Sequence, residues 1–408
     1  MTDRGDLAFG AKIRELRREA GLDQRGLADV LKRSVSWVSQ VERGEIVVGD
    51  VGMLQRLAVA LGVPSRELVE LVLGADAGEA ERQRPHVEVL RLALAGHPAP
   101  REVLGLPAPE EAPPSIDEME RQVGRAWELV HASAFEELGP LLATLIPKLE
   151  ATSRRVDDAE RGSVVAALAD AYQIAAAMLV KVGDLGAAWL AADRAISAGE
   201  RCGDRALVMA GELRMAHTFV NAQERDLAIH VLRQAVEISG ALSADTDFGI
   251  VSLTGGCALL LAVLEARQGR SDEARRHLKV AENLAKRLGG DRNDYGTEFG
   301  PTNVKLHQVA VAVELGNAAE ALDLARRVDP AALSPERQAR FLVDVARAHA
   351  QRRAVASAVA TLADAERIAP AEIRESRRVR ELIGDLEHMA GGRAVPGLRA
   401  LRRRATHN

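Results

Sequence analysis

The sequence predicts an all-α protein of two or more domains. Its 408 residues exceed the roughly 100–200 of a typical single domain, and 47% of them are hydrophobic against 28% charged, which is typical of globular chains. Only 3% are aromatic, which disfavours a β-sandwich or a β-barrel. Recurring alanine and leucine instead favour helices that pack closely.

Composition and charge exclude several other classes. Two cysteines, Cys202 and Cys257, cannot build a disulfide framework or a four-cysteine metal site, so we expect a cytoplasmic protein without a metal or cofactor. The first residues, MTDRGDLAFGAKIREL, are charged where a signal peptide would be apolar. The most apolar stretch, Ile250 to Ala266, is too short for a membrane span. Because the net charge is −5, any contact with nucleic acid must be local.

Residues 7–73 predict five short helices with recognisable ends. Gly21 can close the first helix because glycine readily adopts the left-handed conformation. Asp23 and Asp50 are expected N-caps, and Pro64 suits a first helical turn. The expected helices are, in order, about Ala8 to Ala20, a short one after Asp23, Ser34 to Glu42, one after Asp50, and Pro64 to Leu73.

Residues 74–115 have a different composition and are expected to form a linker. One amphipathic helix is predicted near His86 to Ala95. The following segment, HPAPREVLGLPAPEEAPPS, contains prolines that prevent regular structure. We therefore predict a semi-extended connection between two domains.

Residues 116–390 contain an internal helical repeat. Five segments share a turn, an alanine some five residues later, and then an apolar stripe. The alanines, 37 to 47 residues apart, are Ala188, Ala228, Ala274, Ala321 and Ala358. That spacing fits a pair of helices and a loop, and such pairs must stack because none can bury its apolar face alone. Residues 391–408 are expected to be a basic, solvated tail.

The first domain resembles a known family. The segment IRELRREAGLDQRGLADVLKRSVSWVSQVERG and the following LQRLAVALGV resemble the helix-turn-helix of the phage repressor and Cro-like (XRE) transcription regulators. The resemblance covers about 65 residues and implies a five-helix, lambda-repressor-like DNA-binding domain at residues 1–73. It identifies Ser34 to Glu42 as the helix that enters the major groove, where all base pairs can be distinguished.

The resemblance also implies roles for single residues. Val35, Ser36 and Gln40 would face base edges: Gln40 can pair with adenine, Val35 can pack on a thymine methyl, and Ser36 is ambiguous. Arg17 and Glu42 occupy positions that often form a structural salt bridge. The residues expected to hold phosphates or sugars are Gln24, Arg25, Trp37 and Arg43.

The sequence departs from the family at the tight turn, where Lys32 and Arg33 replace the common glycine and apolar residue. A left-handed lysine there would cost about 1 kcal/mol relative to glycine. Alternatively, Lys32, Arg33 and Ser34 contact phosphates. A compact bundle that no longer binds DNA is the other interpretation, although such a bundle has no need of polar Ser36 and Gln40.

The repeats resemble the tetratricopeptide-like helical repeats that are fused to such DNA-binding domains in actinobacterial regulators, and they are similar to those of peptide-sensing quorum regulators. This resemblance implies that the first helix of each pair lines a concave, ligand-binding face. Candidate ligand residues are Met209, Glu212, Phe219, Asn221, Thr302, Asn303, His307, Gln308, Arg337, Arg340 and Asp344. The alternative is that these polar groups cap helix ends or face water.

These features together predict a transcription regulator that is no enzyme, because no HExxH, GxSxG, P-loop or dinucleotide motif is present. One recognition helix reads only a few base pairs, so we expect a homodimer on two half-sites of double-stranded DNA. A peptide, small molecule or protein bound to the repeats would modulate DNA binding. The alternative is an interaction scaffold whose repeats recruit a partner and whose DNA contact is secondary. We expect no membrane partner.

Overall fold

The computed structural model describes residues 4–31, 33–44, 46, 51–63, 84–96, 115–241, 247–374 and 376–406. These ranges are helical apart from their turns, one 3-10 turn and one isolated bridge between Arg292 and Phe299. The prediction of an all-α fold, with a helix-turn-helix domain before a helical solenoid, is confirmed. Contacts divide the chain into two units, Met1–Pro85 and His86–His407, and each is considered separately.

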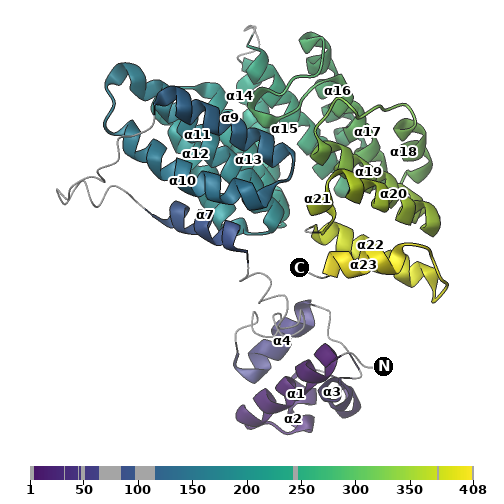
Figure 1. The fold of residues 1–408 in the computed structure, drawn as a ribbon. Coiled ribbons are helices and arrows are strands. Elements are labelled where there is room, and N and C mark those ends of the chain that lie inside the picture. The colour runs from purple at the N-terminus through teal and green to yellow at the C-terminus, as the bar shows by residue number, and fades with distance from the viewer. Residues whose placement is uncertain are drawn as a thin grey trace. The chain divides into compact units, whose positions relative to one another are not determined.

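The first unit has four described helices: α1 Arg4–Glu19, α2 Gln24–Leu31, α3 Val35–Glu42 and α4 Val51–Leu61 (Figure 1). As predicted, Asp23 caps α2, because its Oδ1 accepts a hydrogen bond from the Gly26 amide at 2.6 Å. The expected cap Asp50, the turn residue Lys32 and the expected helix Pro64 to Leu73 lie outside the described residues.

Helix α3 is held against α1 by close backbone packing. A Cβ at Gly10 of α1 would lie 2.5 Å from the Val41 carbonyl oxygen, so only glycine allows this approach. The core beneath it is formed by Phe9, Ile13, Leu16, Leu27, Ala28, Leu31, Val38, Val41, Met53, Leu57, Ala58 and Leu61. The apolar residues of all four helices therefore fix how α3 is presented.

The helix expected within the linker is present as α7 Pro85–Ala95, but it belongs to the second unit. Val87, Leu90 and Leu94 are buried in the core formed by α9 to α12. Their three- and four-residue spacing forms one apolar stripe, which packs on the repeats. The linker expected over 74–115 is therefore interrupted by a packed helix, and its proline-rich part, 97–114, lies outside the described residues.

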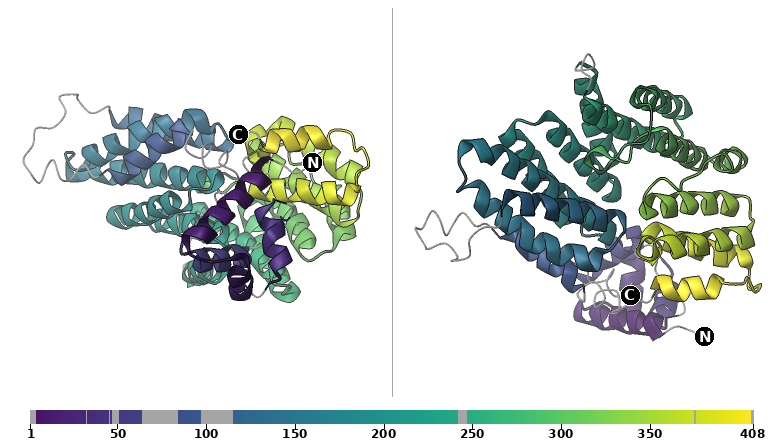
Figure 2. Two further views of the ribbon diagram at one scale, coloured as in Figure 1. Left: turned by 90° about the horizontal axis from the view of Figure 1, so that it is seen from below. Right: turned by 45° about the horizontal axis from the view of Figure 1, so that its top comes forward.

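The second unit is a series of helix pairs that follow one another side by side from α9 to α20, with α21 to α23 after them (Figures 1 and 2). The pairs are α9 Ile116–His131 with α10 Phe135–Ser153, α11 Asp158–Val182 with α12 Leu185–Cys202, α13 Arg205–Asn221 with α14 Arg225–Ala241, α15 Phe248–Arg267 with α16 Ser271–Leu288, α17 Pro301–Glu314 with α18 Ala318–Ala325, and α19 Pro335–Gln351 with α20 Val355–Ile368. The 3-10 turn η1, Asp294–Gly296, precedes α17.

A single turn type joins the two helices of each pair. The predicted alanines Ala188, Ala228, Ala274, Ala321 and Ala358 are fully buried, and each is the fourth residue of a second helix. Five residues before each alanine stands a residue with positive φ: Gly183, Gln223, Gly269, Gly316 and Arg353. The backbone amide of the following residue donates a hydrogen bond to a carbonyl of the first helix. In the second pair, for example, the Asp184 amide donates to the Leu179 carbonyl at 2.9 Å. This is the Schellman arrangement, repeated in every pair.

The sequence missed one copy of this repeat. In the α9–α10 pair, Ser133 has a φ of 56° and the Ala134 amide donates to the Leu129 carbonyl at 2.9 Å. Leu138, five residues after Ser133, occupies the position that an alanine has in the other five pairs, and it is fully buried. The copy was not predicted because leucine stands where the other five copies have the alanine that marks the repeat.

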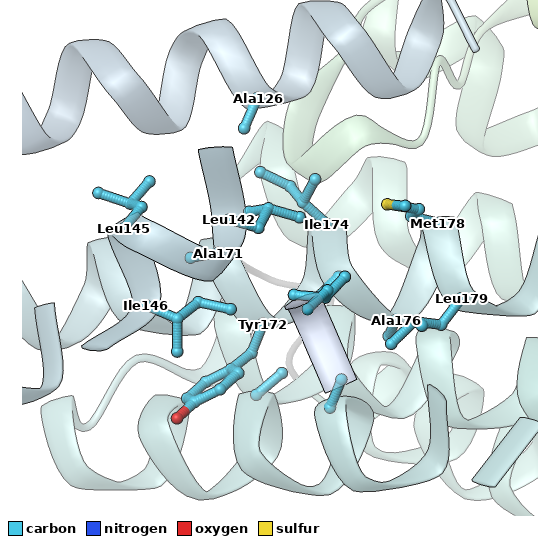
Figure 3. Packing of buried hydrophobic residues seen from close by; sticks show 14 of the residues in the cluster. Ala126, Leu142, Leu145, Ile146, Ala171, Tyr172, Ile174, Ala176, Met178 and Leu179 are labelled. Carbon is cyan, nitrogen blue, oxygen red and sulfur yellow. The ribbon is translucent and has the colours of Figure 1, made fainter. Parts of the chain in front are cut away.

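Long apolar helices run through the centre of the second unit. Ala126, Leu142 and Ile174, from α9, α10 and α11, meet between these helices in Figure 3. By length and composition α11 and α15 could each cross a membrane, so the expectation that Ile250 to Ala266 is too short does not hold for α15 as a whole. In each, 72% of the most apolar window is buried in the unit, which is typical of a core helix.

The C-terminal residues differ from the expected solvated tail. Helices α21 Pro370–Arg374 and α22 Arg377–Ala390 pack on α19 and α20, and α23 Leu398–Thr406 packs on α21 and α22. Leu398, Leu401 and Ala405 are buried on one face of α23. Arg404 pairs with Glu366 at 2.6 Å. The basic residues therefore sit on the outer side of a packed helix, because the apolar residues between them have helical spacing.

The early and late helices of the second unit also contact each other. Lys181 of α11 lies 2.7 Å from Glu336 of α19 and 2.5 Å from Glu372 of α21. Ser133, after α9, donates to Glu372 at 3.3 Å. These contacts join segments about 150 to 240 residues apart.

Candidate nucleic-acid interface

Helix α3 turns one face into the first unit and the other outward. Val38, Val41 and Glu42 are buried, whereas Val35 is 41% exposed and Ser36 is exposed. Gln40 is half-buried. Ser34 caps the helix, because its Oγ accepts a hydrogen bond from the Trp37 amide at 3.1 Å. The residues predicted to read bases, Val35, Ser36 and Gln40, therefore lie on the side of α3 that is not buried in the first unit.

A buried ion pair fixes α3 on α1. Arg17 donates from Nε and Nη2 to the two carboxylate oxygens of Glu42 at 2.6 and 3.2 Å, and from Nη1 to the Leu22 carbonyl at 2.7 Å. Burial alone would raise the pKa of Glu42, but hydrogen bonds from Arg17 and Gln24 outweigh it and lower that pKa. Arg17 and Glu42 form the salt bridge that the family resemblance implied.

Gln24 has a structural contact that the sequence did not indicate. Its Nε2 donates to Glu42 at 2.8 Å and so connects α2 to α3. Gln24 was predicted to hold a phosphate. The side chain remains half-buried at the surface. Gln24 therefore sets the angle between the two helices, in addition to any contact it makes with DNA.

Positive side chains stand at both ends of α3, and a further one is exposed on α2. The Arg33 guanidinium lies 5.5 Å from the centre of the Trp37 ring, and Arg25 is exposed on α2. Arg43, at the other end, donates to Ser39 at 2.6 Å. A helix N-terminus with flanking arginines attracts anions, because the free amides and the helix dipole are positive there. This geometry suits the phosphates of a nucleic acid.

Comparisons with known proteins agree with the first unit. Residues 8–72 match the family model described as a helix-turn-helix domain. No curated protein matches. Among solved structures, the crystal structure of Bacillus thuringiensis PlcR in complex with the peptide PapR7 and DNA shares 16% identity, covering 69% of this chain and 96% of that chain with a TM-score of 0.27. A likeness that weak supports no conclusion about this chain.

The predicted ligand residues of the second unit have varied environments. Met209 is buried in a hydrophobic core, Phe219 packs against the same core, and Glu212 is half-buried with its pKa raised by burial. Several others are engaged locally: Asn221 with the His217 carbonyl, Asn303 with the Glu298 carbonyl, Gln308 with Glu282, and Asp344 with Arg347. The Thr302 amide donates to Asp291.

His307, Arg337 and Arg340 belong instead to a charged cluster inside the second unit. Burial, together with the charge of Arg337, lowers the pKa of His307 to about 3. Burial and the charges of Arg214, Arg340 and Arg337 lower the pKa of His217 well below its usual range. Both rings are therefore neutral near pH 7, and the positive charge comes from arginine and lysine.

A loop before α17 lies against this cluster. Arg214 donates to the Tyr295 carbonyl at 2.9 Å and Arg337 donates to the Thr297 carbonyl at 3.2 Å. Asn303 holds the Glu298 carbonyl at 2.9 Å. Tyr295 and Glu298 both have positive φ, a strained conformation for these residue types. The loop is thus clamped by side chains from α13, α17 and α19.

Sequence analysis missed the residues that complete the cluster: Trp127, His131, Asp170, Gln173, Lys181, Arg214 and His217. A signal was available for Arg214, which interrupts the apolar run RALVMAGELRMAHTF. A charged residue among buried positions must find a partner or serve a function. The others come from helices far apart in the sequence, so only the folded unit brings them together.

Proposed function

We propose that the protein is a sequence-specific, cytoplasmic transcription regulator of the XRE type. The observation that carries this proposal is α3, whose exposed Val35 and Ser36 stand on a helix fixed from behind by the buried pair Arg17–Glu42. The match of residues 8–72 to a helix-turn-helix domain supports it. The proposal includes no catalytic step.

DNA recognition by this unit calls for a homodimer. A single helix of eight residues contacts only a few base pairs. Two copies of the chain would read two half-sites about one helical turn apart, or a multiple of it. The sequence-specific affinity then comes from both half-sites together.

We assign the second unit to effector binding. Its stacked helix pairs bring together charged side chains from α11, α13 and α19, which suit a peptide or another polar ligand. A ligand that changes the dimer geometry would change half-site spacing and hence DNA affinity. A coupling of about 1–3 kcal/mol is sufficient for a useful switch.

Selection of bound duplexes from a random pool tests DNA recognition. We expect one enriched sequence, and Gln40→Ala should relax base choice at one position by about 1–3 kcal/mol. Arg43→Ala should weaken all duplexes alike and lower the salt slope by about 1. Arg121→Ala, at an exposed site on α9, is the matched control and should change neither.

Two outcomes would contradict the proposal. Failure to enrich any sequence would favour the alternative, a scaffold whose repeats recruit a partner. Identical effects of Gln40→Ala and Arg43→Ala would show that the two side chains do not have the separate roles of base reading and phosphate contact.

A further inference from the structure

Arg214 is a buried cation that forms no ion pair among the described residues, although the charges of Glu336 and Asp170 act on it. It is 9% exposed. Its hydrogen bonds go to the backbone carbonyls of the loop, and its guanidinium lies 5.4 Å from the centre of the Trp127 ring. Its Nε has no hydrogen-bond partner. An arginine held this way is strongly disfavoured by desolvation.

The neighbouring helices α11 and α9 also carry buried polar atoms that have no hydrogen-bond partner among the described residues. Gln173 on α11 is fully buried, yet neither its amide nitrogen nor its amide oxygen has a hydrogen-bond partner among the described residues. His131 on α9 stacks on Trp127 at 5.6 Å, and its Nε2 is also buried without a partner. Helix α11 packs against both α9 and α13. Buried polar groups are almost always paired, so three unpaired polar side chains on adjoining helices form a polar region suited to a hydrogen-bonding ligand.

Arg340 supplies an accessible positive charge to the same cluster. Its side chain is 51% exposed, and its only ion pair in the described part of the chain is a long one, 3.4 Å to Glu336. That carboxylate lies closer to Lys181, at 2.7 Å. The charges of Arg340 and Arg214 both act on His217, which stands one helical turn after Arg214. A ligand that reaches Arg340 from solvent thus approaches Arg214 as well.

Three carboxylates of the cluster are already engaged by partners other than Arg214. The four cations are Lys181, Arg214, Arg337 and Arg340, and these three carboxylates are Glu298, Glu336 and Glu372. Each carboxylate is engaged: Glu298 accepts two hydrogen bonds from Ser334 at 2.7 Å, and the other two pair with Lys181. Asp170 is a fourth carboxyl group whose charge acts on Arg214; burial raises its pKa to about 7, so it is partly ionised near pH 7. None of these carboxyl groups forms an ion pair with Arg214 among the described residues, so its guanidinium is available to a further carboxylate.

We infer that this inner cluster binds one carboxylate of the effector, with Arg214 and Arg340 as its cationic contacts and Gln173 as a hydrogen-bonding contact. Arginine suits a carboxylate because its planar fork matches the two oxygens. The carboxylate can be the C-terminus of a peptide or the acid group of a small metabolite. The inference rests on the proposed effector-binding role of the second unit and names its ligand chemistry.

Trp127 provides the reporter for a direct test. The chain has three tryptophans, so the full-length double variant Trp37→Phe, Trp189→Phe retains only the one that touches the cluster. Three probes are titrated: a pool of random hexapeptides with free C-termini, the same pool with C-terminal amides, and a panel of small mono- and dicarboxylic acids. We expect a free acid to change Trp127 emission, and amidation or esterification to weaken binding at least tenfold.

Variants then connect the signal to the cluster. Arg214→Gln and Arg340→Gln should each weaken binding of the free acid at least tenfold, and Arg214→Lys should restore part of it. Arg276→Gln, at an exposed site on α16, is the matched control and should bind normally. If Arg214→Gln does not fold, Arg340→Gln still decides the question, because its side chain is exposed.

The inference is overturned if no acid changes the emission, if acid and amide bind equally, or if both glutamine variants retain wild-type affinity. Peptide acids and small acids as separate arms identify the source of the carboxylate. Affinity for the selected duplex is measured in parallel in the chain that keeps Trp37. An acid that binds without changing duplex affinity leaves the carboxylate site standing and contradicts only the proposed modulation of DNA binding.

Discussion

Among the described residues, each unit has one arginine that is almost completely buried. The arginine of the first unit is paired with a carboxylate, and that of the second unit is not. Arg17 is 8% exposed and directs three nitrogens to Glu42 and the Leu22 carbonyl. Its pKa is raised by the hydrogen bond to Glu42. Arg214 is 9% exposed, but its contacts are the Trp127 ring and the Tyr295 carbonyl oxygen instead of a carboxylate. Burial lowers its pKa to about 10.

This difference separates a framework from a binding site. In the first unit the buried charges satisfy each other, so the interior is complete and function is left to the outer face of α3. In the second unit Arg214 forms no ion pair among the described residues, and both amide atoms of Gln173 lack a hydrogen-bond partner there. A folded chain retains such groups at a cost in stability, and ligand binding is one reason to retain them.

Replacement of each arginine by methionine gives the largest expected effects. Arg17→Met leaves the buried carboxylate of Glu42 with only Gln24 and the more distant Arg14, at 3.5 Å. We expect the first unit to lose about 3–5 kcal/mol of its free energy of unfolding. Arg214→Met removes a buried charge that forms no ion pair, but also its hydrogen bonds to the Tyr295 and Gly296 carbonyls, so the second unit should change by only about 1 kcal/mol.

Urea denaturation measures both effects, because Trp37 lies in the first unit and Trp127 in the second. Single-tryptophan variants follow each unit separately. Equal destabilisation by the two substitutions would remove the distinction between framework and site. Destabilisation by Arg214→Met alone would reverse it.

The dependence of stability on pH should also differ between the units. Burial raises the pKa of Asp170 to about 7, so the folded second unit holds a proton that the unfolded chain releases near pH 4. The contribution of Asp170 to stability is therefore present at low pH and is lost as the pH rises toward 7. Glu42, with a lowered pKa, behaves in the opposite way and loses its contribution as the pH falls.

Asp170→Asn tests that dependence. At pH 7 it should stabilise the second unit on the order of a few kcal/mol, since one pKa unit corresponds to about 1.4 kcal/mol, and the gain should shrink toward pH 4. The readout is the melting temperature of the wild type and the variant between pH 5 and 7.5. A difference that stays constant with pH would show that Asp170 has no raised pKa.

Two glycine substitutions compare the packing of the units. Gly10→Ala places a Cβ 2.5 Å from the Val41 carbonyl oxygen, so α1 and α3 must separate, at about 1–3 kcal/mol. Gly124→Ala in α9 meets nothing within 4 Å and should stabilise the helix by about 0.5–1 kcal/mol. Urea midpoints check both signs. If Gly10→Ala were tolerated, the position of α3 would not depend on that close approach.

The sequence predicted features that depend on neighbouring residues, and it did not predict contacts between distant segments. Helix ends such as Asp23 and Ser34 and the stripe of buried alanines follow from spacing and side-chain chemistry, and the Arg17–Glu42 pair follows from a family resemblance. Helix α7 was predicted but assigned to a linker, whereas it packs in the second unit. Helix α23 was predicted as a solvated tail, because its arginines masked the short apolar stripe of Leu398, Leu401 and Ala405.

The inner cluster could not be predicted for a physical reason. Lys181 and Glu336 are separated by more than 150 residues, and the solenoid's curvature decides whether they meet. Curvature results from small rotations between successive pairs, which no single motif encodes. Of the expected ligand residues, His307 and Arg340 are in this cluster, whereas Met209 contributes to a core instead.

The smallest predicted effect concerns the turns of the repeat. Arg353 is exposed and has a φ of 56° at the position where Gly183 stands in another pair. A left-handed conformation costs a non-glycine residue about 1–2 kcal/mol, and glycine loses up to about 1 kcal/mol of backbone entropy, so Arg353→Gly should stabilise the second unit by about 0.5 kcal/mol. Arg352→Gly is the matched control: the residue is exposed but has a φ of −86°, so the same change should destabilise. Urea denaturation followed through Trp127 resolves the two signs, and the same sign for both would mean that the Schellman turn does not select glycine at this position.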